Sequence, residues 1–292
     1  MKISVVVTNW NGLDLLKKNL EQVIKMSPEA DEIIIADDAS PDKSVEYIKE
    51  LQKKYSKLKL IVNKTNLGFG KNSNNAITKS KGDLVVMLNS DIFPHADYIK
   101  KSLKHFNNPQ VMGVGFAEEE HQNWARIYWK SGYLQHEAGI NNINKTHITA
   151  WLSGGSSIVR KEIFQKLGGF DEIYAPFYCE DLDLGYRAWK SGYILLWEPK
   201  SVVNHRHEST ISKFSKSLLN YVKERNRLLS VWRNITDPKM IGLNKIALIG
   251  RVLSGPNYIK IIRAAKKQIK TVHSPIVFPK LTDKEIFSKF KK

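Results

Sequence analysis

Residues 83–91 read Asp-Leu-Val-Val-Met-Leu-Asn-Ser-Asp. The apolar run at the centre of this stretch is typical of a strand that is buried on both faces of a parallel sheet. The polar residues that follow predict that the strand ends at Leu88. Three similar runs precede it, at residues 3–8, 32–36 and 58–62. The first hundred residues therefore predict an α/β fold.

The segments between these predicted strands are typical of helices. In residues 13–26, apolar side chains recur at the three- and four-residue spacing of one helix face. Pro41 and Asp42 begin a second such segment, and the Gly- and Asn-rich residues 66–81 lead into a third. This alternation predicts a Rossmann-like, mostly parallel central sheet flanked by helices, with right-handed crossovers.

Polar residues gather where the predicted strands end. They are Thr8 and Asn9, Asp37 and Asp38, residues 63–74, and residues 89–91. Ligands of doubly wound sheets bind at the carboxyl ends of the strands. We therefore expect a ligand site at this edge of the sheet.

The alternation is less regular after residue 91. Residues 117–147 are predicted to be a long irregular loop that carries Trp124, Arg126, Tyr128, Trp129, Tyr133 and His136. Beyond it we expect a strand at residues 149–159, a short helix at 161–167 that Gly168 and Gly169 close, a helix at 180–190, and a strand at 193–197. From residue 212 onward the pattern is helical and basic.

The net charge of +17 is unevenly distributed. Residues 213–292 contain 19 Lys and Arg against 4 Asp and Glu, a net charge of +15, so the preceding residues are nearly neutral. We predict a main domain at residues 1–211, with a nucleotide-binding half at 1–91 and an acceptor and catalytic half at 92–211. A basic helical extension is predicted at residues 212–292.

The single cysteine, Cys179, cannot form an internal disulfide, which favours a reducing compartment. The apolar run at the N-terminus is too short for a signal peptide. No stretch approaches the roughly 18 uncharged apolar residues of a membrane span. These features predict a soluble, cytoplasmic protein.

Several residues at the strand ends could carry chemistry, and each has a plainer alternative. Asp91 can bind a hard divalent cation that also holds phosphate oxygens, or can belong to an ordinary polar turn. Asp37 and Asp38 can accept hydrogen bonds from a base or ribose, or can cap the next helix. The glycines of residues 66–74 permit close approach of the backbone to a nucleotide, although the Gly-Lys-Ser/Thr of a P-loop is missing.

Two segments of the second half could take part in catalysis. Glu180, Asp181 and Asp183 fall in the first turn of a predicted helix, where the helix dipole favours acids. One of them could instead be a general base. His205 could ligate a metal or contact a diphosphate, or could be a surface histidine. A structural zinc site is not expected, because no second Cys or His group has zinc spacing.

Taken in order, these segments resemble the inverting family 2 glycosyltransferases of the GT-A fold, in particular the rhamnosyltransferase-like branch. The matching segments are the first strand and turn (residues 5–12), the uridine-contacting segment (35–42), the loop over the nucleotide (66–74), the strand that ends in the metal motif (82–91), two acceptor-side segments (152–156 and 168–172), the catalytic helix (180–187), a His-containing segment (205–210) and an Arg-Asn helix (224–226). Asn89 departs from the pattern, since many members have an Asp there, and this departure weakens the expected metal affinity.

The resemblance implies a role for each matching residue. Asp181 is the implied general base, and Asp91 and His205 are the implied ligands of Mg²⁺ or Mn²⁺. The implied nucleotide-sugar site consists of Thr8, Asn9, Asp37, Asp38, Gly68, Asn74, Asn89 and Ser90. The acceptor side is predicted to hold Gly154, Gly155 and Glu180, together with Trp129 from the 117–147 segment. The expected reaction is single displacement from a UDP- or dTDP-sugar to a glycan or lipid-linked acceptor.

The basic extension allows three interpretations. It can be a solvated helical surface, a contact with an anionic membrane, or a contact with nucleic acid or a partner protein. For the membrane, Ile259, Ile261, Ile262 and Ile269 lie among basic residues. Nucleic acid is not favoured, because only charge supports it. For the whole chain, a sugar nucleotidyltransferase and a non-catalytic scaffold are the alternatives to a glycosyltransferase.

Overall fold

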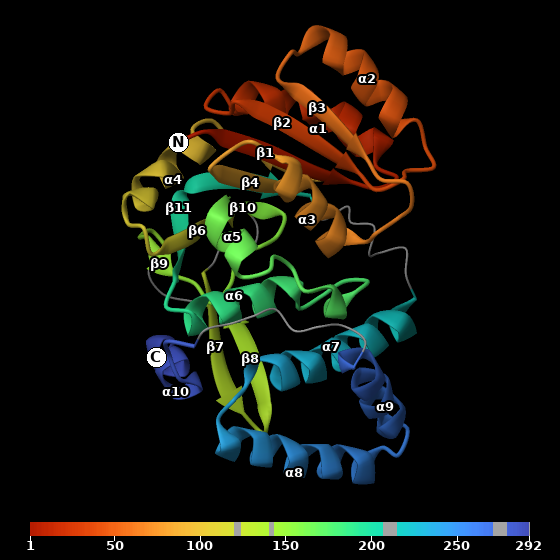
Figure 1. Ribbon diagram of the computed structural model, residues 1–292, viewed down its shortest axis with the longest axis vertical. Helices are drawn as coiled ribbons and strands as arrows, with labels where there is room; N and C mark the ends of the chain where they lie inside the picture. The colour runs from red at the N-terminus through yellow and green to blue at the C-terminus, as the bar shows by residue number, and fades with distance from the viewer. Residues whose placement is uncertain (120–123, 140–142, 207–214, 271–278, 292) are drawn as a thin grey trace.

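The computed structural model describes residues 1–119, 124–139, 143–206, 215–270 and 279–291. These residues form a nine-stranded mixed sheet in the order β3-β2-β1-β4-β10-β6-β11-β5, with β9 also paired to β11, and a separate β7-β8 hairpin (Figure 1). The strands are β1 (Ile3–Asn9), β2 (Glu32–Asp37), β3 (Leu58–Val62), β4 (Leu84–Asn89), β5 (Ile92–Pro94), β6 (Val111–Glu118), β7 (Ala125–Lys130), β8 (Tyr133–Ala138), β9 (His147–Ile148), β10 (Ser156–Arg160) and β11 (Ile194–His205).

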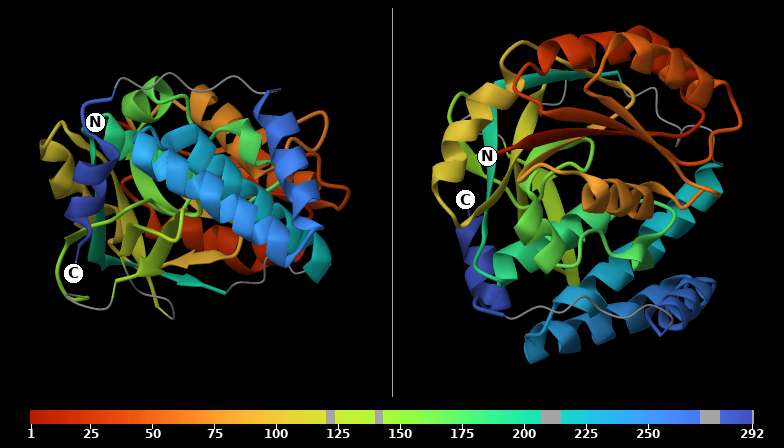
Figure 2. Two further views of the ribbon diagram at one scale, coloured as in Figure 1. Left: turned by 90° about the horizontal axis from the view of Figure 1, so that it is seen from below. Right: turned by 45° about the horizontal axis from the view of Figure 1, so that its top comes forward.

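Helices flank the sheet and form a further layer beyond the hairpin (Figure 2). The α-helices are α1 (Leu13–Met26), α2 (Ser44–Lys54), α3 (Phe69–Lys79), α4 (Tyr98–Leu103), α5 (Lys161–Lys166), α6 (Glu180–Lys190), α7 (Lys216–Asn234), α8 (Pro238–Ser254), α9 (Tyr258–Ile269) and α10 (Asp283–Lys289). Two short 3-10 helices are η1 (Lys104–Asn107) and η2 (Glu172–Tyr174).

The N-terminal half confirms the predicted parallel sheet. β3, β2, β1 and β4 are parallel to their neighbours. Their register places Thr8 beside Asn89 and Asn9 beside Asp37, so the polar strand ends do lie at one edge. Beyond β4 the pairing is mixed, because β10 is antiparallel to both β4 and β6.

The strands of this half alternate between two apolar cores, as a period of two requires. Val5 and Val7 of β1 face the core that contains Leu20 of α1. Val6 faces the opposite core, which contains Phe164 of α5. Helices α1, α2 and α4 therefore cover one face, and α3, α5 and α6 cover the other (Figure 1).

Two predictions for the region around residues 117–159 are wrong. The predicted irregular loop contains a β-hairpin in which Ala125 pairs with Ala138 and Lys130 pairs with Tyr133. Ser131 and Gly132 form its turn with positive φ angles. The predicted strand at 149–159 begins only at Ser156.

The predicted strand at 193–197 is also too short. It is the first part of β11, which continues to His205, so that the histidine ends the strand itself. The register against β6 shifts between Glu198 and Val202. Pro199 lies at this shift, and a proline normally marks an edge or a bulge of a strand, which hides the continuation in the sequence.

The described part of the predicted extension is helical, but its helices differ in how they pack. Ile286, Phe287 and Phe290 from the α10 region join the main core. The buried carboxylate of Asp283 pairs with Lys190 Nζ of α6 at 2.8 Å. α7 and α10 are therefore part of the main body, whereas α8 and α9 lie at its periphery (Figure 1). No helix among the described residues is both long enough and apolar enough to span a membrane.

Candidate functional site

Asp37, at the end of β2, organises the first part of the strand-end edge. Its side chain is fully buried. It accepts hydrogen bonds from Asn9 Nδ2 at 2.8 Å, from Ser40 Oγ at 2.7 Å and from the Ser40 backbone N–H at 2.9 Å. Ala39, which precedes Ser40, has a φ of 58°. Asp37 and Asn9 are thus brought together as predicted, but their polar groups hold the loop between β2 and α2.

Asp38 holds the loop that precedes α3. One carboxylate oxygen accepts hydrogen bonds from Asn63 Nδ2 at 2.9 Å and from the Leu67 backbone N–H at 2.8 Å. The other accepts from the Gly68 backbone N–H at 2.8 Å. Gly68 has a φ of 81°, a conformation that favours glycine and that lets the chain turn into α3.

Asn74 of α3 does not point toward the edge. Its Nδ2 donates to the Phe170 carbonyl at 2.8 Å, and its Oδ1 accepts from the Phe170 backbone N–H at 2.9 Å. A Cβ on Gly169, where φ is 64°, would lie 2.5 Å from Asn74 Oδ1. Both ends of the Asn74 amide therefore hold the Gly168–Phe170 segment against α3, and its role in the nucleotide site stays a prediction.

Asn89, at the end of β4, contacts both halves of the molecule. Its Oδ1 accepts a hydrogen bond of 3.3 Å from Thr8 Oγ1. A Cβ on Gly155 would lie 2.3 Å from Asn89 Nδ2, and one on Gly154 would lie 2.8 Å from the Phe69 ring. Both glycines, predicted on the acceptor side, therefore serve the close contact of the 153–155 turn with β4 and α3.

Ser90 belongs to the turn that presents Asp91. Asn19, a buried residue of α1, donates from Nδ2 to the carbonyls of Ser90 at 2.8 Å and Ile92 at 2.6 Å. This clamp fixes the backbone on both sides of Asp91. Asn19 was missed by the sequence analysis, although a polar residue among the apolar positions of a helix is a signal that could have found it.

His205 lies between two carboxylates. Its Nε2 is 3.3 Å from Asp91 Oδ1, and its Nδ1 is 3.0 Å from Glu118 Oε2. Burial lowers the pKa of His205, but the hydrogen bonds and charges of Asp91 and Glu118 outweigh it and raise the pKa to about 9. Ser156 Oγ donates to the other oxygen of Glu118 at 2.6 Å. The predicted pairing of Asp91 and His205 is present, and Glu118 is an addition that the sequence analysis missed.

The Asp91 and His205 pair fits a divalent cation whose remaining ligands come from a substrate. Mg²⁺ is commonly held by one or two carboxylates together with phosphate oxygens and water. Two ligand atoms about 2.1 Å from an octahedral ion and at a right angle are about 3 Å apart, close to the 3.3 Å between Nε2 and Oδ1. Glu118 on Nδ1 matches the carboxylate that typically orients a metal-binding histidine. Within the described residues, no three His, Cys, Asp or Glu side chains form a metal site alone.

The N-terminus of α6 presents two carboxylates that differ from those at the strand ends. Asp181 is partly exposed and accepts a hydrogen bond of 2.7 Å from the Leu182 backbone N–H. Glu180 Oε2 is buried and has no hydrogen-bond partner among the residues that the structure describes. Burial raises the pKa of Asp181, and burial together with the charge of Asp181 raises the pKa of Glu180. One proton is therefore readily shared or exchanged at this position.

The remaining polar residues of α6 position this acidic pair. Asp183 is buried and accepts hydrogen bonds from Tyr174 Oη at 2.9 Å, Arg187 Nε at 2.7 Å and Asn234 Nδ2 at 2.8 Å. Arg187 also donates to the Gly169 carbonyl at 2.8 Å. These contacts fix α6 to the segment that begins at Gly168.

Asn226 of α7 holds the loop immediately before α6. Its Nδ2 donates to the carbonyls of Tyr174, Phe177 and Tyr178 at 2.8, 2.9 and 2.8 Å. The loop is strained, because Tyr178 and Cys179 have φ angles of 73° and 77°. The Arg-Asn helix expected from the family resemblance therefore supports the backbone that presents Glu180 and Asp181.

A cavity of about 210 Å³ lies beside Glu118. Its lining includes Trp124, His136, Trp151 and Ser153. The β7-β8 hairpin supplies His136, whose ring meets that of Trp151 edge to face at 5.1 Å. The segment predicted to shape an acceptor pocket thus borders a cavity next to the candidate metal residues.

Trp129 is not part of this cavity. Its ring packs 6.5 Å from the Phe287 ring of α10, at the margin of the main core. The ring therefore packs at the margin of the core and not in this cavity, and the acceptor role of Trp129 stays a prediction. Ser209 and Thr210, which belong to the predicted His-containing segment, lie outside the described residues.

Comparison with known proteins agrees with this geometry. Residues 4–168, more than half of the chain, match Glycosyl transferase family 2. The O-antigen chain rhamnosyltransferase RfbN of Salmonella typhimurium is 23% identical over 220 residues, which cover 72% of this chain and 68% of that protein. The N-acetylglucosaminyl-diphospho-decaprenol L-rhamnosyltransferase of Mycobacterium tuberculosis is 36% identical over 88 residues, 30% of this chain and only 27% of that relative.

Solved structures show the same fold at low sequence identity. GalNAc-T7 with UDP, GalNAc and Mn²⁺ has a TM-score of 0.63 and 18% identity, over 80% of this chain and 48% of that one. Staphylococcus aureus TarS 1-349 in complex with UDP-GlcNAc has a TM-score of 0.58 and 16% identity, over 92% and 78%. With its GT-A architecture and the match over residues 4–168, the chain belongs to glycosyl transferase family 2.

Proposed function

We propose that this chain is an inverting glycosyltransferase that transfers a sugar from a UDP- or dTDP-sugar to a hydroxyl of a glycan or lipid-linked acceptor in cell-surface polysaccharide synthesis. The observation that carries the proposal is the acidic pair at the start of α6, where Asp181 is partly exposed and Glu180 Oε2 has no hydrogen-bond partner in the described part of the chain. The names of the rhamnosyltransferase relatives support this class of donor and acceptor.

Asp181 is the general base of the proposed reaction. The acceptor hydroxyl gives its proton to the Asp181 carboxylate while its oxygen attacks the anomeric carbon, and the bond to the diphosphate breaks on the opposite face. The raised pKa makes Asp181 a stronger base than an ordinary aspartate, while it remains largely ionised near neutral pH. Glu180 assists by holding its own proton, so that the two carboxylates are not both charged.

Asp91 and His205 hold the diphosphate of the sugar donor through the metal ion, and Glu118 orients His205. When bound there, Mg²⁺ or Mn²⁺ offsets the negative charge that develops on the departing diphosphate. The base and ribose lie along the edge formed by Thr8, Asn89 and the Gly68 loop. Because Asp37 has no exposed surface, any direct carboxylate contact with the base belongs to Asp38.

The acceptor enters through the cavity of about 210 Å³ beside Glu118. Trp151 offers an aromatic side chain to a sugar ring, and His136 and Ser153 offer hydrogen bonds.

The test is incubation of the full chain with UDP-, dTDP- and GDP-sugars, with and without Mn²⁺, while released nucleotides are identified. Release of nucleoside diphosphate from a UDP- or dTDP-sugar, dependent on Mn²⁺ and lost in Asp181→Asn, is expected. Formation of nucleoside triphosphate and sugar 1-phosphate when pyrophosphate is added would indicate a sugar nucleotidyltransferase instead. Neither turnover nor thermal stabilisation with any donor would indicate a non-catalytic scaffold.

A further inference from the structure

Helix α8 is apolar yet hardly buried. Of its 17 residues only Asn244 is buried. Four large apolar side chains recur at helical spacing along α8, and their exposed fractions are 49% for Leu243, 67% for Ile246, 62% for Ile249 and 79% for Leu253. Ile249 and Leu253 lie at the mouth of the groove between α8 and its neighbours and also line it. A contiguous exposed apolar strip of this kind marks an interaction surface rather than scattered surface residues.

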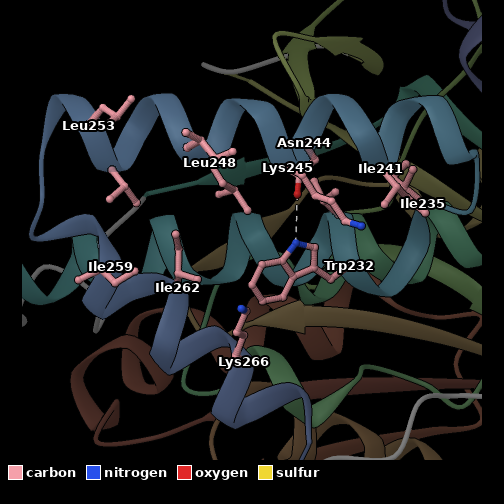
Figure 3. Close-up of a pocket in the computed structure, with 13 residues that line it drawn as sticks. Trp232, Ile235, Ile241, Asn244, Lys245, Leu248, Leu253, Ile259, Ile262 and Lys266 are labelled. Carbon is pink, nitrogen blue, oxygen red and sulfur yellow. Dashed lines mark hydrogen bonds between the residues drawn. The ribbon is translucent and has the colours of Figure 1, made fainter.

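The inner side of α8 is fixed by polar contacts and by Ala247, Leu248 and Val252, which pack against the cluster beside α7 and α9. Asn244 Oδ1 accepts a hydrogen bond of 3.1 Å from Trp232 Nε1, and Asn244 Nδ2 donates to the Gly132 carbonyl at 2.8 Å. An open, mainly apolar groove of about 710 Å³ separates α8 from α7 and α9 (Figure 3). Leu248 and Ile262 face each other across this groove.

The charged residues of α8 and α9 themselves are all basic. Residues 238–282 contain no Asp or Glu, and residues 238–270 contain eight Lys and Arg. Those on α8 are Lys239, Lys245 and Arg251, and the others are Lys260, Arg263, Lys266, Lys267 and Lys270. Arg251 pairs with Glu224 of α7 at 2.7 Å. All eight residues are exposed, and within the described part of the chain only Arg251 forms an ion pair.

We propose that α8 lies flat on an anionic lipid bilayer, with Leu243, Ile246, Ile249 and Leu253 inserted at the level of the headgroups. Apolar side chains on one face with Lys and Arg beside them are the features of an interfacial helix. Each Lys or Arg near an anionic surface strengthens binding about fivefold. The four exposed apolar residues of α8 supply the apolar contact, and the basic residues of α8 and α9 supply the charge.

In the structure, α8 and not α9 carries the exposed apolar residues of the basic extension. The isoleucines of α9, expected from the sequence to face a membrane, instead pack inward. Ile262 is buried, and Ile261 and Ile269 contact the same cluster beside Leu228 and Leu229 of α7. α9 therefore contributes charge to the surface, and α8 contributes the apolar strip.

Charge complementarity favours a bilayer over a second copy of the chain. Two copies that met through α8 would bring two groups of eight basic residues together with no acidic residue between 238 and 282 to balance them. Like charges that face each other oppose such association. An anionic lipid surface satisfies both the apolar strip and the positive charge. This inference goes beyond the proposed transfer reaction and does not depend on it.

The test is sedimentation of the full chain with vesicles of phosphatidylcholine alone and of phosphatidylcholine mixed with phosphatidylglycerol. We expect binding only to the mixed vesicles, weakening as salt is raised. Ile246→Glu should reduce the binding constant tenfold or more. Val62→Glu is the matched control, because Val62 is 48% exposed on β3 at the opposite end of the molecule (Figure 1), and it should bind like the wild type.

Further variants separate charge from apolar contact and from misfolding. Replacement of Lys260 and Lys267 by Gln should weaken binding about fivefold for each charge removed. Circular dichroism melts check each fold, and Leu253→Glu replaces Ile246→Glu if that variant unfolds. Equal binding to both vesicle types, wild-type binding by Ile246→Glu, or a lipid-independent dimer that Ile246→Glu dissociates would overturn the proposal.

Discussion

The carboxylates at the strand ends and those at the start of α6 are equally prominent in the sequence, but the structure uses them in opposite ways. Asp37 and Asp38 are buried, and each accepts three hydrogen bonds from side chains or backbone. Asp181 is partly exposed and Glu180 Oε2 has no partner.

The difference separates structural acids from acids that remain available for chemistry. A carboxylate that is fully hydrogen-bonded fixes a loop and has little capacity left for a substrate. A carboxylate that is desolvated and short of partners has a raised pKa and can accept a proton, which is typical of functional sites. α6 contains both kinds, since Asp183, two residues after Asp181, is fully hydrogen-bonded.

Asp181→Asn should produce the largest effect. Loss of a general base should lower kcat by about 10²–10⁴-fold, whereas the melting temperature should stay near that of the wild type because Asp181 accepts only the Leu182 N–H. Steady-state kinetics and a thermal melt check both parts. Near-normal turnover would remove Asp181 from the role of base.

Asp183→Asn is the matched control within the same helix. It removes one partner of the buried pair with Arg187, whose N–O distance is 2.6 Å. Breaking a buried ion pair destabilises by about 3–5 kcal/mol, so urea unfolding should show a large loss of stability. A stable Asp183→Asn protein with a severe loss of kcat would contradict the distinction between the two aspartates.

Glu118→Gln tests whether Glu118, which the sequence did not predict, supports metal binding by Asp91 and His205. Glu118 orients His205 through a contact of 3.0 Å, and loss of such a partner typically lowers metal affinity 10–100-fold. Titration with Mn²⁺ followed by electron paramagnetic resonance measures this without any turnover. Asp91→Ala should weaken binding further, and unchanged Mn²⁺ affinity in both variants would separate these residues from the metal.

The acidic pair of α6 should also give a pH dependence. Its raised pKa means that the folded state keeps a proton at a pH where an unfolded aspartate, with a pKa near about 4, has lost it. As pH rises above about 4, stability should fall, while kcat should rise by at most about tenfold per pH unit as the base ionises. Urea unfolding and kinetics across pH measure both, and Glu180→Gln with Asp181→Asn should flatten the stability change.

Trp129→Phe should have the smallest effect. The Trp129 Nε1 atom is buried without a hydrogen-bond partner, and the ring packs against Phe287. Replacement by another aromatic ring should therefore change stability by less than about 1.5 kcal/mol and leave kcat unchanged. A rise in the KM for the acceptor alone would indicate that Trp129 contacts the acceptor.

The sequence predicted the N-terminal half well because local pattern and tertiary structure agree there. The strands at residues 3–8, 32–36, 58–62 and 83–88 and the helix at 13–26 were each found from apolar runs or helical spacing. The edge where Thr8, Asp37 and Asn89 meet followed from the topology alone, since parallel strands place their carboxyl ends together.

Other features depended on contacts between residues distant in the sequence. The Glu118–His205 pair joins residues that are 87 positions apart, so no local sequence pattern indicates it. The β7-β8 hairpin was hidden because charged and polar residues interrupt its apolar ones, and Pro199 hid the second half of β11.

What the sequence determined by itself was the family resemblance, the strand-end edge and the basic charge of the last 80 residues, because composition and period are local properties. Only the tertiary structure decided which carboxylates are already hydrogen-bonded and which apolar residues of the basic region stay exposed. Asp181 differs from Asp183, and Ile246 of α8 from Ile262 of α9, only in what packs against them. Burial and hydrogen bonding depend on the whole fold, so a local pattern cannot assign them.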